Sequence, residues 1–93
     1  MNNKLVKYLK NQINKIRRKR DTDCEIDNRY SPCDIERALR ALGWEWVAVQ
    51  SGDNLESSNI YIYENEKENF NLAFQWNCWY HYQWLAMAES EED

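Results

Sequence analysis

The N-terminal segment places its apolar side chains at helical spacing. These residues recur every three or four positions: Leu5, Leu9, Ile13 and Ile16. Such spacing puts them on one stripe of an α-helix, and we predict a helix over about residues 3–19. The stripe is narrow and the remaining surface is polar, so this helix should pack against the rest of the chain along one edge.

A second helix has recognisable start and stop signals. Ser31 is a suitable N-cap, and Pro32 fits the first helical position, where its missing N–H is not needed. An apolar face follows at Ile35, Ala38, Leu39 and Leu42. Gly43 then suits the position after the C-cap, where the backbone adopts positive φ. We predict a helix over about 32–42.

Beyond this helix the apolar period changes to two residues, which is typical of strands with one buried face. The alternation predicts strands over about 44–50, 59–63 and 70–76. The first of these strands would have Trp44, Trp46 and Ala48 on one face. The polar segments 51–58 and 64–69 would connect the strands.

Two further segments have weaker patterns. A fourth strand over about 79–87 is favoured by its aromatic content. One face of this strand would consist of Tyr80, Tyr82, Trp84 and Ala86. The alternative is a helix, because the aromatic residues of the segment also recur at helical spacing. Residues 21–30 are polar and aperiodic, and we expect a connecting loop.

These elements occur in the order α-α-β-β-β-β, with a helix as the alternative for the last. They predict an α+β fold in which two N-terminal helices pack on one face of a three- to four-stranded antiparallel sheet. Ninety-three residues indicate a single domain, 1–93. It would comprise a basic amphipathic helix (1–20), a helix-plus-sheet body (31–88) and a frayed acidic tail (89–93).

Charge is divided unevenly along the chain. Residues 1–20 contain eight basic residues and no acidic residue, a charge of +8. The other four basic residues stand against all sixteen acidic residues in 21–93, a charge of −12. The overall charge of −4 therefore conceals a steep asymmetry, which points to charged partners.

The cysteines give little evidence of a metal site. Cys24, Cys33, Cys78 and His81 make a conceivable zinc set, but the first two are too far apart in sequence for the usual ligand spacing. Three cysteines and no apolar signal segment are typical of free thiols in a reducing compartment, so we expect a cytoplasmic protein without metal or cofactor. No apolar run approaches the about 18 residues of a membrane-spanning helix.

Three surfaces are candidates for binding. An aromatic sheet surface would comprise Tyr61, Tyr63, Trp76, Trp79, Tyr80, Tyr82 and Trp84, since one face cannot bury every ring under two short helices. An acidic edge would comprise Asp53, Glu56, Glu64, Glu66 and Glu68. A basic surface of the first helix, able to contact nucleic acid or an acidic partner, would comprise Lys7, Lys10, Lys15, Arg17, Arg18, Lys19 and Arg20.

Catalysis is disfavoured because the chain has one histidine and neither a glycine-rich phosphate loop nor a nucleophile motif. We therefore expect a non-catalytic protein-interaction module that regulates or inhibits a macromolecular partner. Small acidic proteins that phages and mobile elements direct against host nucleic-acid-handling defence complexes have this general character. The alternatives are a nucleic-acid-binding protein that uses helix 3–19 and a self-associating structural protein, such as a homodimer.

Overall fold

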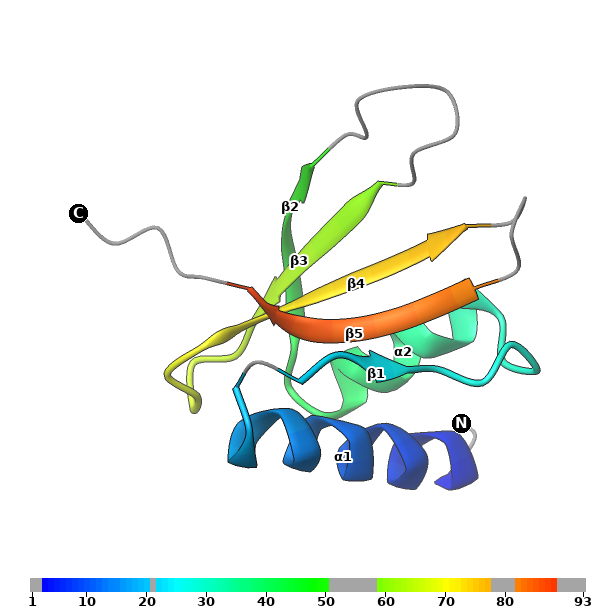
Figure 1. Ribbon diagram of the computed structural model, residues 1–93, viewed down its shortest axis with the longest axis horizontal. Helices are drawn as coiled ribbons and strands as arrows, with labels where there is room; N and C mark the ends of the chain where they lie inside the picture. Colours follow the sequence, from blue (N-terminus) through cyan, green and yellow to red (C-terminus); the bar gives the residue numbers. More distant parts are fainter. Residues whose placement is uncertain (1–2, 21, 51–58, 78–81, 89–93) are drawn as a thin grey trace.

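The computed structural model describes residues 3–20, 22–50, 59–77 and 82–88. In chain order its elements are α1 (Asn3–Arg18), β1 (Cys24–Glu25), α2 (Pro32–Ala41), β2 (Glu45–Gln50), β3 (Ile60–Glu64), β4 (Asn71–Asn77) and β5 (Tyr82–Ala88). The strands form one antiparallel sheet in the order β1-β5-β4-β3-β2. Figure 1 shows both helices on the same side of this sheet. The predicted α+β fold, with two N-terminal helices against an antiparallel sheet, is confirmed.

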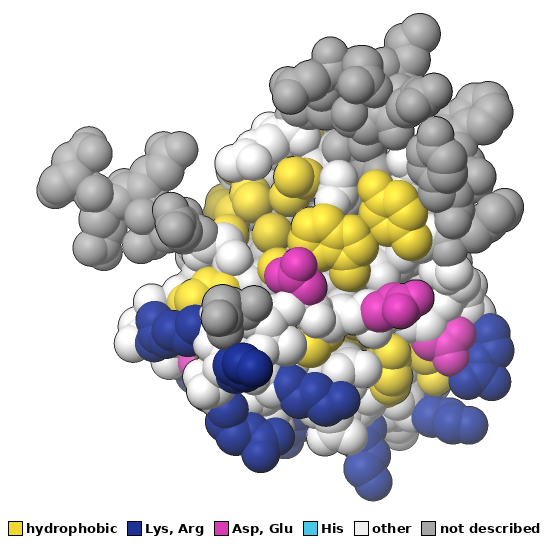
Figure 2. Space-filling model, viewed as in Figure 1, with side chains coloured by type: hydrophobic (Ala, Val, Ile, Leu, Met, Phe, Trp, Pro, Cys, Tyr) yellow, Lys and Arg dark blue, Asp and Glu magenta, His cyan; other side chains and the backbone are white. Residues whose placement is uncertain are grey.

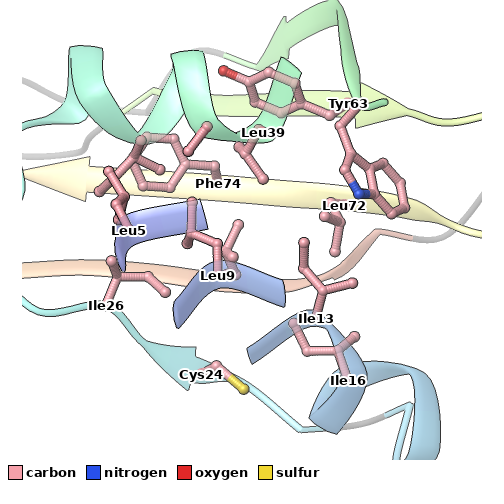
Figure 3. Close-up of a cluster of buried hydrophobic side chains, with 14 of the residues drawn as sticks. Leu5, Leu9, Ile13, Ile16, Cys24, Ile26, Leu39, Tyr63, Leu72 and Phe74 are labelled. Carbon is pink, nitrogen blue, oxygen red and sulfur yellow. The ribbon is translucent and has the colours of Figure 1, made fainter. Parts of the chain in front are cut away.

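The apolar stripe of the first helix is buried over its whole length. Leu5, Leu9, Ile13 and Ile16 all belong to the hydrophobic core. Figure 3 shows Leu5 and Leu9 directed from α1 toward the strand that carries Leu72 and Phe74. Each buried leucine or isoleucine contributes about 1.5–3 kcal/mol to stability. The stripe therefore holds α1 on the sheet while its charged side chains stay in solvent. Neither described helix is long and apolar enough to cross a lipid bilayer.

The ends of α2 carry the capping interactions that the sequence predicts. The Ser31 hydroxyl accepts a hydrogen bond from the Asp34 backbone N–H at 3.2 Å. After the C-cap, the Gly43 N–H donates to the Arg40 carbonyl and the following N–H donates to the Leu39 carbonyl, as in a Schellman motif. Gly43 has φ of +95°, a value that L-residues rarely adopt. The chain thereby turns directly from α2 into the buried Trp44.

The sheet has one face toward the helices and one face without them. Strand register places these residues on the helix side: Tyr61, Tyr63, Leu72, Phe74, Trp76, Gln83, Leu85 and Met87. The opposite face carries Ile60, Ile62, Ala73, Gln75, Tyr82, Trp84 and Ala86. The core lies between the first set and the two helices, and it includes residues of β1, β3, β4 and β5. No residue of β2 belongs to it among the parts of the chain that are described.

The expectation of a simple loop over 21–30 is wrong in one respect. Cys24 and Glu25 form the short edge strand β1, which pairs with β5. The Ile26 N–H extends the pairing by donating to the Gln83 carbonyl at 2.8 Å. Cys24 and Ile26 are buried while Glu25 is exposed, but this alternation is too short to be recognised without the neighbouring strand. The sheet consequently has five strands.

The prediction that Trp44, Trp46 and Ala48 share a face is also wrong. Trp44 precedes β2, and the pairing register shifts between Trp46 and Ala48, so Val47 is the extra residue of a β-bulge. Trp46 pairs with a helix-side residue of β3 and Ala48 pairs with a residue of the opposite face. One inserted residue reverses the alternation that a regular strand would have.

The last segment is a strand, so the helical alternative for it is wrong over Tyr82–Ala88. Tyr82, Trp84 and Ala86 share a face as predicted, whereas Tyr80 and the tail 89–93 lie outside the described residues. The shared face is the one without helices. Gln83 and Leu85 supply the buried face of β5, because their partners in β4 face the core.

Replacing Gly43 by Ala should destabilise the fold by about 1–2 kcal/mol, because an L-residue is strained at this φ. The added Cβ would also lie 3.0 Å from the Asn65 amide nitrogen. Chemical denaturation measures the change in the free energy of unfolding. Gly43→Asn is the control, since asparagine tolerates positive φ better and should lose less. Equal stability of Gly43→Ala and the wild type would contradict the role of the positive φ.

Candidate interaction surface

The aromatic residues expected to form one exposed surface are divided between locations. Tyr63 is 2 % exposed and belongs to the core. Tyr61 and Trp76 are partly buried on the helix side of the sheet, whereas Tyr82 and Trp84 are partly buried on the opposite side. Trp79 and Tyr80 lie outside the described residues. The described members of the predicted set therefore form no single aromatic cluster.

The exposed large hydrophobic side chains among the described residues instead occupy β2. Trp46 is 55 % exposed, Val47 is 48 % exposed and Val49 is 45 % exposed. Every residue of β2 is exposed, and the strand lies at the end of the sheet beside β3 alone. An uncovered apolar edge strand is unusual, because such edges invite pairing with another chain. Sequence reasoning placed these residues on a strand but did not assign them to a site.

The Trp46 ring is held against its own strand. Its indole Nε1 donates a hydrogen bond to the Ala48 carbonyl at 2.8 Å. Its ring meets the Tyr61 ring edge-on, with centroids 6.3 Å apart and planes at 61°. Two attachments fix the side chain while leaving more than half of its surface open. An aromatic group fixed in this way loses little conformational entropy when a partner covers it.

Two clefts meet at the N-terminal end of β2. One, of about 500 Å³, lies between the end of α2 and the β3–β4 connection, and its lining includes Glu45, Glu64 and Glu66. The other, of about 390 Å³, extends along Trp46 and is lined by Glu36 and Arg40 among others. Glu45 lines both clefts. The exposed tryptophan is thus bordered by two acidic side chains, Glu36 and Glu45, and by one basic side chain, Arg40.

The larger cleft is negatively charged, and a hydrogen bond connects its two sides. Glu45 lies directly opposite Glu64 in the β2–β3 pairing, and Glu66 follows two residues later. The Asn65 amide donates to the Leu42 carbonyl at 3.2 Å, which ties the β3–β4 connection to the end of α2. The C-terminus of a helix also carries partial negative charge. Like charges on opposed strands are unfavourable alone, so a cation in this cleft would relieve their repulsion.

The predicted acidic edge is only partly assembled. Glu64 and Glu66 line the cleft, and Glu45 joins them without having been predicted. Glu68 instead pairs with Arg17 of α1. Asp53 and Glu56 lie outside the described residues. The signal for Glu45 was available in the sequence, since it adjoins a strand tryptophan, but only the β2–β3 register brings it beside Glu64.

The basic surface around α1 is divided, because Arg17 and Arg20 bind the body whereas Arg18 and the lysines do not. Arg17 forms an ion pair with Glu68 and lies 5.9 Å from the Phe70 ring centre, and Arg20 donates to Asn69 at 3.2 Å. Arg18 bonds within its own helix, to the Asn14 carbonyl. The four lysines of α1 and Lys19, which follows the helix, are exposed and form no ion pair in the described part of the chain: Lys4, Lys7, Lys10, Lys15 and Lys19. Figure 2 shows Lys and Arg side chains along the edge formed by α1.

The cysteines do not assemble a metal site in the described residues. Cys24 is buried, where its thiol donates to the Gln12 carbonyl, and burial raises the pKa of this thiol. Cys33 is exposed on α2. Cys78 and His81 lie outside the described residues, and no group of three potential ligands occurs within them.

A small cavity of about 170 Å³ near the start of β5 is lined by Tyr30, Trp76 and Gln83, among others. The Gln83 amide nitrogen donates to the Tyr30 carbonyl at 2.8 Å and to the Asp27 carbonyl at 3.3 Å. These bonds fix the orientation of the amide and link the chain after β1 to β5. The amide oxygen has no partner in the described structure, but it is closed to solvent and so out of reach of a ligand in the cavity.

Burial raises the pKa of Tyr63 to about 12, and the nearby Glu36 adds to the increase. The raised pKa means that the folded state holds this proton more tightly than the unfolded state does. The resulting stability, about 2–3 kcal/mol for a shift of this size, is present below pH 10 and is lost as pH rises toward 12.

We expect Tyr63→Phe to reduce the loss of stability between pH 10 and 12, because the group that ionises is absent. Denaturant unfolding at several alkaline pH values measures this, with Tyr82→Phe on the opposite face as the matched control. The same alkaline loss in Tyr63→Phe and in the wild type would show that Tyr63 is not responsible.

Comparison with known proteins finds no matching family model, no similar curated protein and no similar solved structure.

Proposed function

We propose that this protein is a non-catalytic interaction module that binds another protein through β2 and thereby regulates or inhibits a macromolecular partner. The observation that carries the proposal is the position of Trp46, Val47 and Val49 on an uncovered edge strand. We name the surface formed by these three residues and by Glu45, Glu64 and Glu66 the β2 surface.

The β2 surface combines the two features that protein interfaces use. Trp46 is a fixed aromatic anchor, the residue type most enriched among interface hot spots. The glutamates at the N-terminal end of β2 form a negatively charged rim, which accelerates encounter with a basic partner and disfavours an acidic one. Apolar anchors with a charged rim can give both affinity and selectivity.

An acidic binding surface also provides a means of inhibition. Proteins that handle nucleic acids carry basic grooves for phosphate groups. A compact acidic module with an apolar anchor that covers such a groove would exclude the nucleic acid. The acidic composition favours one form of this proposal, an inhibitor from a phage or mobile element that acts on a host defence complex in the cytoplasm.

Covalent capture tests the β2 surface directly. A photo-crosslinking amino acid at Gln50, the exposed end of β2, should capture a partner protein in host cells, whereas the same group at Arg37 on α2 should not. Trp46→Ala should lower the yield about tenfold or more, as expected for a hot-spot tryptophan.

Trp84→Ala is the matched control, because it removes a tryptophan from the opposite sheet face and should leave the yield unchanged. Circular dichroism should show that Trp46→Ala remains folded, since this side chain lies outside the core. Equal capture by wild type and Trp46→Ala would contradict the proposal.

The lysines of α1, together with Lys19, favour a second candidate, a nucleic-acid-binding protein. Five exposed lysines without ion pairs in the described structure are available for phosphate contacts. This surface would be independent of β2, which lies at the far edge of the sheet from β1 and shares no core packing with α1. The acidic body opposes such binding by repelling the same phosphates.

Replacing Lys4, Lys7, Lys10 and Lys15 by Gln should abolish retention of DNA or RNA at low salt if this second candidate is correct. Each lost phosphate contact should also lower the slope of log affinity against log salt by about one. Arg29→Gln with Arg37→Gln is the control for charge away from α1. Absence of nucleic-acid retention by the unmodified protein would eliminate the candidate.

A further inference from the structure

We infer that the partner presents an extended basic segment, which adds to the sheet as a sixth strand beside β2 and places a lysine or arginine side chain in the acidic cleft. This inference rests on the proposed function and specifies the partner that the β2 surface accepts. The inference is based on two neighbouring features. One is the uncovered apolar edge strand β2, and the other is the cleft at its N-terminal end, which is lined by Glu45, Glu64 and Glu66.

The backbone of β2 is suited to pair with an added strand. β2 is hydrogen-bonded to β3 on one side and has no strand on the other within the described sheet. The opposite edge strand, β1, consists of two residues, whereas β2 has six and so offers a longer row of backbone groups. Strand addition to such an edge supplies main-chain hydrogen bonds with little rearrangement.

The side chains of β2 favour an apolar segment on both faces. Trp46 and Val49 lie on the helix side, because the bulge at Val47 places these two residues on the same face of the sheet. Glu36 and Arg40 of α2 line the cleft beside Trp46, but Trp46 remains 55 % exposed, so an apolar residue of the added strand can still pack against it. On the opposite face Ala48 is small and leaves room for a larger neighbouring side chain.

The charge of the cleft requires a cation at one end of that segment. Glu45 and Glu64 are directly opposed, and Glu66 lies on the same wall, against the single cation Lys67 in the lining. A lysine or arginine that enters the cleft pairs with carboxylates which otherwise repel one another. An apolar strand without a cation would gain only the contact with Trp46 and the main-chain hydrogen bonds.

The same charge argument disfavours a second copy of this chain as the occupant. Self-pairing would bring another β2, whose only charged residue is Glu45. It would supply no cation to the cleft, so the repulsion among the cleft carboxylates would remain. An extended segment with a basic residue can pair with the apolar edge and also place a cation in the acidic cleft. A different protein chain therefore fits this surface better than a second copy does.

A short synthetic peptide tests the inference. It has alternating valine and threonine with a lysine at each end, and its binding is measured by nuclear magnetic resonance titration of the full chain at low salt. We expect shifts in the β2 amides and slower hydrogen exchange of those at the free edge. Glu64→Gln with Glu66→Gln should weaken binding about tenfold, an effect that added salt should diminish.

The matched control is Asp23→Asn with Glu25→Gln, which removes the same charge from exposed positions at the opposite edge and should leave affinity unchanged. A peptide N-methylated on alternate residues should not bind, because it keeps the charge but loses main-chain donors. Equal binding of the N-methylated peptide, equal binding by the Glu64/Glu66 variant, or no peptide binding would overturn the inference.

These results are distinguishable from failure of the proposed function. If Trp46→Ala abolishes crosslinking at Gln50 while the peptide experiments give any overturning result, β2 binds a partner that is not an extended basic segment. If Trp46→Ala leaves crosslinking unchanged, the β2 surface is not the interface and both proposals are wrong. Sedimentation of the free protein as a dimer that Trp46→Ala converts to a monomer would assign the edge to a second copy and overturn the basic-segment inference.

Discussion

Two helices cover only part of a five-stranded sheet, and this geometric constraint determines which part of the sheet stays exposed. The buried stripe of α1 and the apolar face of α2 pack onto residues of β1, β5, β4 and β3. β2 lies beyond this cover at the end of the sheet, with Trp46, Val47 and Val49 exposed. The packing that stabilises the fold therefore also exposes its most apolar edge.

The charged side chains are also distributed unevenly between the helices and the far end of the sheet. Arg17 and Arg20 attach the C-terminal end of α1 to the β3–β4 connection. A partly exposed ion pair such as that of Arg17 contributes at most about 1 kcal/mol, so the apolar stripe determines the position of α1 and the charges adjust its end. The acidic cleft forms earlier in the chain, at Glu64, which ends β3, and at Glu66, near the start of the same connection. Positive and negative surfaces thus lie on different elements.

Local patterns predicted most of the fold because their causes are local. The stripe of α1, the Ser31 cap and the positive φ at Gly43 each depend on residues within a few positions. The candidate site was less predictable. Exposed aromatic residues were expected between positions 60 and 88, but Tyr63 is in the core and the exposed anchor is Trp46. Which ring is covered depends on where the helices lie on the sheet, and periodicity does not encode that position.

The sequence by itself determined the two helices, the antiparallel sheet class and the division of charge, since spacing, caps and composition act over short range. Tertiary structure decided the rest. Pairing with β5 made a strand of Cys24 and Glu25, and a bulge at Val47 reversed the faces of β2. Strand register placed Glu45 opposite Glu64 and made an acidic cleft from separated residues. These features arise from contacts between distant segments, because hydrogen-bond register and helix cover are properties of the assembled sheet.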